Sequence, residues 1–265
     1  MGASEVEDAV LRWYAEHYDE STRLAATGHG RLESLRTREL IGRHLAEAPM
    51  AVLDVGGGAG VYAGWLASLG HRVHLVDPVP RHVEAASALA GVTAEVGDAR
   101  ALGGADAAYD LTLVLGPLYH LGSRGDRVLA LREAARVTRP GGSLLAAAIG
   151  RYYVLGEFAL AGALTPERAP RFEHFVRTGE NLHRDGFPVR RSHLWDELRD
   201  EALCAGWQDV QVLAVEGPLG YGVDLVPAER LEEVVAQSAL VAQMVESDPR
   251  ALDLSPHLMV TGRAR

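Results

Sequence analysis

Carboxylates and glycines gather where short apolar runs of the chain pass into helical runs. Asp54 ends the run "AVLD", and Gly56, Gly58 and Gly60 follow it in the pattern D-x-G-x-G-x-G. Because glycine lacks Cβ, such a loop turns tightly and lets a ligand lie against the backbone, and the helix that follows offers free N–H groups. The Asp54 carboxylate beside this loop suits a cationic or amino-bearing ligand.

Two further carboxylates end later apolar runs, Asp77 in "VHLVDP" and Asp98 in "VGDA". Either alone is an ordinary strand-end or capping residue, but their order behind the glycine loop indicates a nucleoside ligand. A second interpretation stays open, because "GAGVYA" from Gly58 to Ala63 also fits the dinucleotide fingerprint G-x-G-x-x-A. Asp54 favours the first interpretation, because a carboxylate is poorly placed beside a pyrophosphate.

Alternating strands and helices must position these side chains. We predict strands at 51–55, 71–77, 92–97, 109–116 and 143–149, and helices near 60–69, 80–90 and 126–138, the last closed by the turn "RPGG". Such alternation indicates an α/β fold with a parallel sheet covered on both faces, where ligands bind beyond the carboxyl ends of the strands.

Segments of different character flank this core. The first fifty residues are predicted to be helical, with a break at "GHG" 28–30 and a second helix that ends at Pro49. The aromatic and basic segment 150–193 interrupts the alternation and is typical of a lid or substrate insert. We predict an N-terminal helical cap (1–49), a cofactor-binding core (50–149), the insert (150–193) and a C-terminal completion of the core (194–265) with two helices and two strands.

Composition narrows the function. The net charge of −10 disfavours nucleic acid and anionic membranes as partners. All 26 basic residues are arginine, which excludes a lysine Schiff base and a phosphate-loop lysine. The single cysteine, Cys204, excludes an internal disulfide and a thiolate metal cluster. The acidic N-terminus and the absence of an eighteen-residue apolar run predict a cytoplasmic protein.

With these motifs the sequence resembles the class I S-adenosylmethionine-dependent methyltransferases, over about residues 36–149 and more weakly to the C-terminus. The resemblance rests on "DVGGGAG", "VHLVDP", "VGDA", "GPLYHL" and "RPGG". It implies a Rossmann-like doubly wound sheet, mostly parallel with a C-terminal antiparallel strand in "PHLMVTGRA", together with N-terminal helices and a lid insert. The implied cofactor is S-adenosyl-L-methionine, with S-adenosyl-L-homocysteine as product.

By this resemblance the glycine loop holds the aminoacyl part of the cofactor, Asp77 the ribose hydroxyls and Asp98 the adenine amino group. Arg36, or its neighbour Arg38, is expected to bind the methionine carboxylate, although a solvated helix face is an equal alternative. Tyr14 and Tyr18, four residues apart, either close over the cofactor or pack. The predicted cofactor contacts are Tyr18, Arg36, Asp54, Gly56, Gly58, Gly60, Asp77, Pro78, Asp98, Ala99 and Gly116.

Methyl transfer from a sulfonium is an in-line displacement, so the protein mainly aligns the groups and excludes water. A hydroxyl or acidic-carbon acceptor also needs a base, for which His120 is the first candidate and His193 the second. Either could instead be structural. Aromatic content suggests a pocket for a planar or apolar small molecule. The predicted substrate contacts are Tyr14, Tyr119, Tyr152, Tyr153 and Phe175.

The sequence therefore predicts a metal-independent methyltransferase of small molecules, monomeric or homodimeric, with O-methylation ahead of N- or C-methylation and natural-product biosynthesis as the expected role. No histidine and carboxylate spacing resembles a metal site. A nicotinamide-dependent oxidoreductase, which would use "GAGVYA", and a cofactor-binding relative that has lost methyl transfer are the alternatives.

Overall fold

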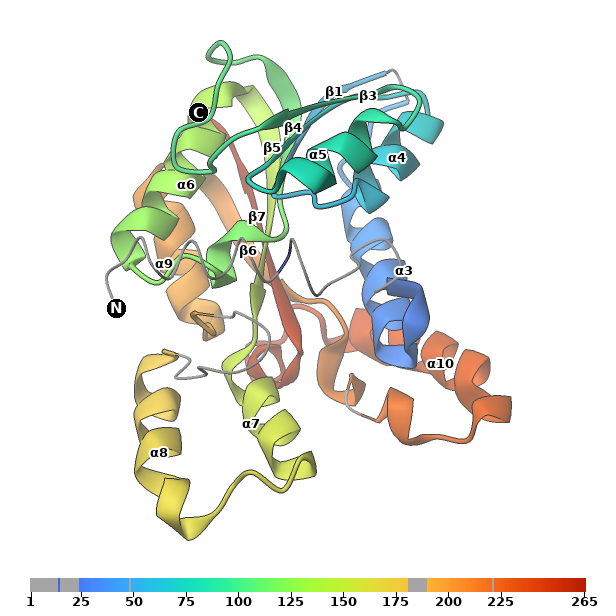
Figure 1. Cartoon of the computed structure of the whole chain (residues 1–265), viewed down its shortest axis with the longest axis vertical. Helices are drawn as coiled ribbons and strands as arrows, with labels where there is room; N and C mark the ends of the chain where they lie inside the picture. Colours follow the sequence, from blue (N-terminus) through green and yellow to red (C-terminus); the bar gives the residue numbers. More distant parts are fainter. Residues whose placement is uncertain (1–13, 15–23, 48, 181–189, 221) are drawn as a thin grey trace.

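The computed structural model describes residues 14, 24–47, 49–180, 190–220 and 222–265. Within them, seven strands form one sheet in the order β3-β2-β1-β4-β5-β7-β6 (Figure 1). The strands are β1 (Ala51–Val55), β2 (Arg72–Asp77), β3 (Val92–Val96), β4 (Tyr109–Val114), β5 (Thr138–Ile149), β6 (Gln208–Ala214) and β7 (His257–Arg263). Only β7 runs antiparallel to its neighbours β5 and β6 among the pairs formed by these strands. The predicted doubly wound, mostly parallel α/β sheet with a C-terminal antiparallel strand is confirmed.

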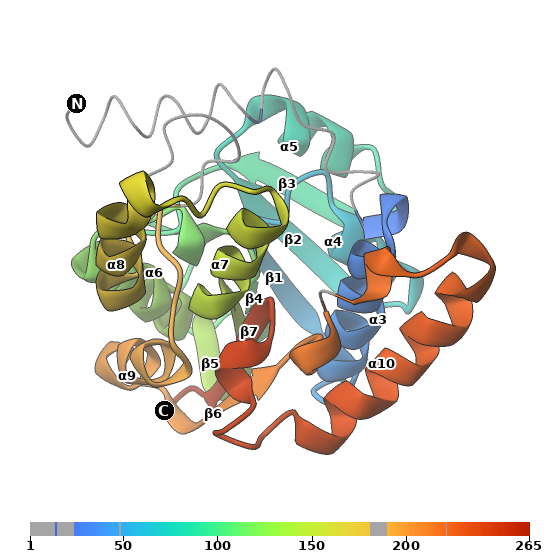
Figure 2. The ribbon, with the colours of Figure 1, turned by 90° about the horizontal axis from the view of Figure 1, so that it is seen from below.

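Helices cover both faces of the sheet (Figure 2). On one face lie α6 (Arg124–Val137) and α9 (Trp195–Ala205), and on the other α3 (Gly28–Gly42), α4 (Val61–Ser68) and α5 (Pro80–Ser87), with α10 (Leu231–Val245) packed on α3. Each face is a hydrophobic core: Leu131 and Leu198 meet one side of the strands, and Ile41 and Leu66 meet the other. The strands are apolar because both of their faces are buried.

Helix α3 begins earlier than the sequence predicts. The three residues "GHG" form its first turn, because Thr27 caps the helix by accepting from the Gly30 N–H at 2.9 Å. The helix packs closely here, since a Cβ on Gly28 would lie 2.5 Å from Leu231 Cδ1 and 2.7 Å from Val223 Cγ1. The helix ends at Gly42, before Pro49. The predicted break therefore falls at Thr27, just before the expected position, because residues 24–26 are helical and the glycines at 28 and 30 belong to α3.

Strand β5 also differs from the prediction. It begins at Thr138, so "RPGG" lies inside the strand, where the register against β4 shifts between Tyr109 and Leu111. The residues of β5 at this irregularity bond to the C-terminal end of the chain beyond β7, where the Gly141 N–H donates to Ala264 O at 2.9 Å. The predicted closing turn is thus an irregularity within a paired strand.

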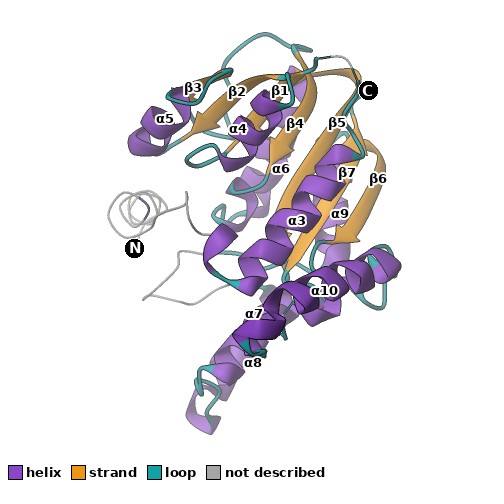
Figure 3. Ribbon diagram, turned by 90° about the vertical axis from the view of Figure 1, so that its right-hand side faces the viewer, coloured by secondary structure: helices purple, strands orange, loops and turns teal. Residues whose placement is uncertain are grey.

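The insert adds two helices, α7 (Arg151–Leu160) and α8 (Ala169–Thr178), which extend beyond the carboxyl edge of the sheet (Figure 3). They pack on one another through Phe158 and Phe172, whose ring centroids lie 5.1 Å apart. Short 3-10 turns occur at Pro117–Tyr119, Pro166–Arg168, Gly217–Leu219, Val223–Leu225, Ala228–Arg230 and Leu252–Leu254. In the part of the chain that the structure describes, no helix has the length and apolar content needed to cross a bilayer.

Candidate active site

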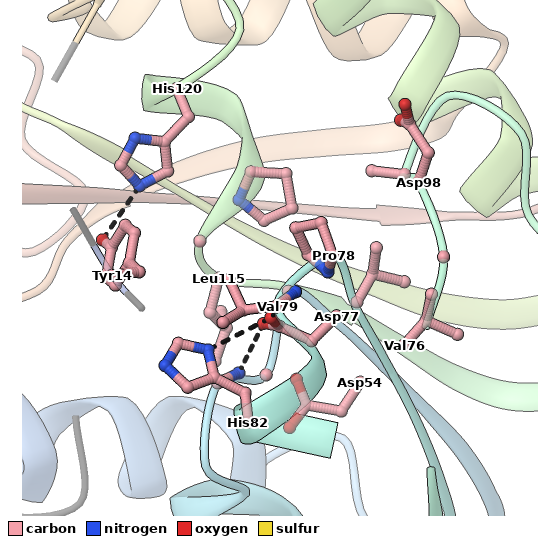
Figure 4. A pocket seen from close by; sticks show the side chains of 18 of the residues that line it. Tyr14, Asp54, Val76, Asp77, Pro78, Val79, His82, Asp98, Leu115 and His120 are labelled. Carbon is pink, nitrogen blue, oxygen red and sulfur yellow. Dashed lines mark hydrogen bonds and ion pairs between the residues drawn. The ribbon is translucent and has the colours of Figure 1, made fainter. Parts of the chain in front are cut away.

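A cavity of about 250 Å³ opens at the carboxyl ends of β1 and β4 (Figure 4). The chain leaves β1 toward β2 and leaves β4 toward β5, so the connections diverge here and leave a crevice between them. The segments that follow β1, β2, β3 and β4 line the cavity together with Tyr14 and Leu24. The predicted contacts Pro78, Ala99 and Gly116 lie in its wall.

The glycine loop turns back on itself below this cavity. Gly56, Gly58 and Gly60 have φ values of 69°, 57° and 86°, in the left-handed region that only glycine adopts readily. A Cβ on Gly56 would lie 2.7 Å from the ring of Pro117, and one on Gly116 would lie 2.9 Å from Gly56 O. The loops after β1 and β4 therefore touch backbone to backbone, which requires glycine on both sides.

Asp77 fastens the loop to the end of β2. Its Oδ2 accepts from the Gly58 N–H at 2.9 Å, and its Oδ1 accepts from the Val79 N–H at 2.9 Å. Nδ1 of His82 lies 3.1 Å from the same Oδ1. The carboxylate is buried in the cavity wall with its orientation fixed, as Figure 4 shows.

Asp54 lies beneath the loop and is 1% exposed. Neither carboxylate oxygen has a hydrogen-bond partner among the described residues, and a Cβ on Gly57 would lie 2.5 Å from Oδ2. Burial and then the nearby charge of Asp77 raise the pKa of Asp54 to about 7. A buried carboxyl without a partner fits an ammonium or sulfonium ligand, which would stabilise its ionised form.

Asp98 lines the cavity from the segment that follows β3. Arg100 holds both of its oxygens, with Nη2 2.6 Å from Oδ2 and Nε 3.0 Å from Oδ1. This pairing lowers the pKa of Asp98 below its usual range, so the carboxylate is ionised near neutral pH. An ionised carboxylate at this place can accept from an exocyclic amino group.

His120 faces the cavity from the turn after β4. Its Nε2 lies 3.0 Å from the Tyr14 hydroxyl, and the Tyr14 ring meets the imidazole edge-on at 5.3 Å. The ring of Tyr119 lies 4.5 Å from that of His120, and all three side chains line the cavity. The structure thus brings together His120, the first candidate for the base, and the predicted substrate contacts Tyr14 and Tyr119.

Arg36 and His193 lie outside the cavity lining, contrary to the predicted roles. Arg36 is fully buried. Its guanidinium donates to Glu39 on the same helix and to Glu246 and Val215 O in the C-terminal part of the chain. His193 is also fully buried, with Nε2 3.3 Å from Glu201 Oε2. Burial lowers the pKa of His193. Both side chains join elements of the fold and do not face the cavity, so the structure does not support the predicted cofactor and base roles.

Among the described residues of the insert, the predicted contacts Tyr152, Tyr153 and Phe175 do not line the cavity either. Phe175 is buried within the insert, Tyr152 is 41% exposed, and Tyr153 stacks on His29 at 5.5 Å. Aromatic composition alone did not distinguish a lid core from a pocket. Tyr18 lies outside the described residues.

His82 was missed by the sequence interpretation. It lies in the first turn of α5, five residues after Asp77, and is 5% exposed. While Nδ1 contacts Asp77, Nε2 has no partner among the described residues, and the Tyr14 ring lies edge-on at 5.8 Å. Its signal in the sequence is a histidine one turn beyond the acidic end of a strand.

Comparison with known proteins agrees with this geometry. Residues 52–142 match the family described as "Methyltransferase domain". A "Ubiquinone biosynthesis O-methyltransferase" of Methylocella silvestris is 36% identical over 119 residues, which is 43% of this chain and 45% of that protein. The match therefore spans less than half the length of this curated relative.

Two solved structures share the fold over nearly the whole chain. A Thermotoga maritima protein described as a methyltransferase, "possible histamine N-methyltransferase", has a TM-score of 0.57 at 17% identity and covers 98% of this chain and 97% of its own. The Burkholderia thailandensis 1,6-didemethyltoxoflavin-N1-methyltransferase, solved with substrate and S-adenosylhomocysteine, has a TM-score of 0.56 at 18% identity. It covers 100% of this chain and 91% of its own.

Proposed function

We propose that the chain is a class I S-adenosylmethionine-dependent methyltransferase and that it transfers a methyl group to an oxygen of a small-molecule acceptor. The relative from Methylocella silvestris is named an O-methyltransferase, which favours oxygen over nitrogen or carbon. A cytoplasmic location and a monomeric or homodimeric state belong to the same proposal. The curated relatives are named for ubiquinone biosynthesis and do not support the natural-product role expected from the sequence.

The observation that carries the proposal is the partnerless Asp54 carboxyl beneath a loop of three left-handed glycines. A dinucleotide would bring a pyrophosphate to this loop, and its negative charge would oppose that of Asp54. The aminoacyl end of the cofactor instead brings an ammonium group. The cavity wall therefore favours the sulfonium cofactor over a nicotinamide dinucleotide.

Bound S-adenosylmethionine supplies a methyl group on a positively charged sulfur. Around it we assign the aminoacyl end to Gly56, Gly58 and Asp54, the ribose to Asp77 and the adenine amino group to Asp98, all of which line the cavity, whereas the predicted contact Gly60 does not. His82 keeps Asp77 oriented through its Nδ1 contact. These residues bind and align, which is the main catalytic requirement of an in-line displacement.

His120 is the proposed base. Bound S-adenosylmethionine would give its methyl group to the acceptor oxygen and keep the bonding pair on sulfur, and His120 Nε2 would accept the proton that the acceptor hydroxyl loses. Tyr14, whose hydroxyl lies 3.0 Å from that nitrogen, either yields its place to the acceptor or relays the proton. The apolar wall, with Val76, Val79 and Leu115, excludes water from the transfer.

Calorimetric titration of the full chain with S-adenosylhomocysteine, and separately with NADH, tests the cofactor. We expect binding of the first only. Tighter binding of NADH, or no binding of S-adenosylhomocysteine at about millimolar concentration, would overturn the proposal. Incubation with S-adenosylmethionine and a metabolite extract, followed by mass spectrometry, then identifies any acceptor that gains one methyl group. Cofactor binding without methyl gain in any extract would favour the relative that has lost transfer.

A further inference from the structure

A second cluster of ionisable side chains lies at the same carboxyl edge of the sheet, outside the cavity. It consists of His29, Glu33, Glu216 and His257, each of which offers one nitrogen or oxygen within 4.8 Å of the others. The first two lie one turn apart on α3, the third follows β6, and the fourth opens β7. We infer that these four side chains bind a divalent transition-metal ion of the zinc class, an activity separate from the proposed methyl transfer.

Glu216 is aimed at the centre of the cluster by its own hydrogen bonds. It is fully buried, and its Oε2 accepts from the His257 N–H at 2.9 Å and from Ser255 Oγ at 3.2 Å. Its Oε1 is thereby left facing His257 Nδ1 at 2.6 Å and His29 Nε2 at 3.9 Å. Ligating carboxylates in metal sites are oriented by such outer contacts.

His29 is oriented in the same way. Its Nδ1 lies 3.4 Å from the carbonyl oxygen of Gly220, so an Nδ1–H donates there and leaves the Nε2 lone pair toward Glu216. Stacking against Tyr153, with an interplanar angle of 16°, fixes the plane of the ring. A second ring nitrogen bonded to a backbone carbonyl is the common arrangement of metal-ligating histidine.

Charge and donor type favour a divalent transition metal. Two carboxylates and two neutral imidazoles carry a charge of −2 in all, which a divalent ion balances. Mixed nitrogen and oxygen donors suit zinc and its neighbours better than magnesium or calcium. Tetrahedral ligand atoms with bonds of about 2.1 Å lie about 3.4 Å apart, so small side-chain shifts from the observed spacing complete the site.

The ion would remain accessible from one side and would join distant parts of the chain. The side chains of His29 and His257 each retain 17% exposure, which leaves room for water or a ligand oxygen. Since β7 is the second strand beyond β4, the cluster is displaced from the cavity by about 10 Å along the sheet. The same ion would tie α3 to the β6–β7 edge and stabilise the fold.

The test is a titration of the chelator-treated full chain with Zn²⁺ by calorimetry and with Co²⁺ by visible absorption. We expect one ion per chain, an absorption band of tetrahedral Co²⁺ and a rise in Tm with Zn²⁺. His29→Ala and His257→Ala should each weaken Zn²⁺ by at least about 100-fold, and Ser255→Ala by about 10-fold.

His74→Ala is the matched control, because His74 lies 3.4 Å from Glu95 in an exposed pair on β2 and β3. It should leave Zn²⁺ affinity unchanged, and circular dichroism shows that each variant is folded. Absence of Zn²⁺ binding by the wild type, or equal binding by folded His29→Ala, would overturn the inference. Neither result depends on S-adenosylhomocysteine binding, so failure of the proposed methyl transfer is detected separately.

Discussion

The two halves of the sheet use buried polar residues in different ways. In the β1–β4 half, Asp54 and Asp77 lie in the last two residues of β1 and β2 and line a cavity. In the β5–β7 half, Arg127, Glu201 and His193 are equally buried but bond to one another. Burial of a charged group therefore marks a binding site only where part of its hydrogen-bonding capacity faces a cavity rather than another element.

Replacement of Gly56 by valine should break the first half most severely. A β-branched residue at φ 69°, with its Cβ 2.7 Å from Pro117, would force the loops after β1 and β4 apart. We expect S-adenosylhomocysteine affinity to fall by at least about 100-fold in calorimetry. Gly104→Ala is the control, since Gly104 also has positive φ but no neighbour within 4 Å. Equal affinity of the two variants would contradict the assigned role of the loop.

Glu201→Gln should act on stability and leave the cofactor site intact. Arg127 and Glu201 form a buried pair at 2.6 Å, and removal of one charge leaves the other uncompensated. We expect a loss of about 3–5 kcal/mol in urea unfolding. Asp106→Asn, which breaks an exposed pair with Arg136, should cost under about 1 kcal/mol. If Glu201→Gln abolished cofactor binding in a folded protein, the separation of the two halves would be wrong.

His120→Gln and His193→Gln compare the two histidines directly. Once an acceptor is found, the first variant should lower kcat by about 100-fold or more while cofactor affinity stays within about threefold. The second should change unfolding and spare kcat, because His193 contacts Glu201 and not the cavity. Steady-state kinetics, corrected for the folded fraction of each variant, distinguishes the two histidines. A large loss of kcat in His193→Gln and none in His120→Gln would make His193 the base.

The pH dependence of cofactor binding sharpens the role of Asp54. With its pKa raised to about 7 in the free protein, ionisation should strengthen S-adenosylhomocysteine binding by about tenfold between about pH 5.5 and about pH 7.5. Asp54→Asn should flatten this profile. Adenosine, which lacks the aminoacyl end, should show no such dependence, and a similar slope for both ligands would contradict the assignment.

The same group affects stability with a defined sign. Since its pKa in the folded state lies above the ordinary value of 3.8, the folded chain holds the proton more tightly than the unfolded chain. The contribution of Asp54 to the free energy of unfolding is therefore greatest below about pH 4 and declines as pH rises toward about 7. Urea unfolding of wild type and Asp54→Asn across this range measures it, and the stability of the wild type relative to Asp54→Asn should fall as pH rises toward about 7.

The smallest effect is expected in the insert. Tyr152 is 41% exposed and lies outside the cavity lining, so Tyr152→Ala should change S-adenosylhomocysteine affinity by less than about twofold. A larger loss would show that α7 closes over the cofactor.

Several cavity-lining residues of the β1–β4 half could be predicted from the sequence because the signals are local. A strand end, a glycine turn and a helix start lie within ten residues of Asp54, and backbone sterics alone fix what such a segment does. The sequence also led from Asp77 to Asp98 through strand alternation. It failed at Arg36, where the deciding partner, Glu246, lies 210 residues away.

The cluster of His29, Glu33, Glu216 and His257 shows the same limit. The sequence predicted a break at 28–30 and so did not place His29 and Glu33 on one helix face. Glu216 and His257 come from the two ends of the β6–β7 connection. No spacing in the sequence could therefore predict that four potential metal ligands lie together. The expectation of a metal-independent protein was made without knowledge of this cluster.

By itself, then, the sequence determined the sheet architecture, the nucleotide-type loop and the strand-end carboxylates, because hydrophobic periodicity and glycine conformation act over neighbouring residues. Tertiary structure alone decided which histidines and arginines face a cavity and which form buried ion pairs with other parts of the fold. The physical reason is that the charge state of a side chain and its unused hydrogen-bonding groups depend on partners that packing brings together. Those partners can lie far away along the chain, where no local sequence pattern shows them.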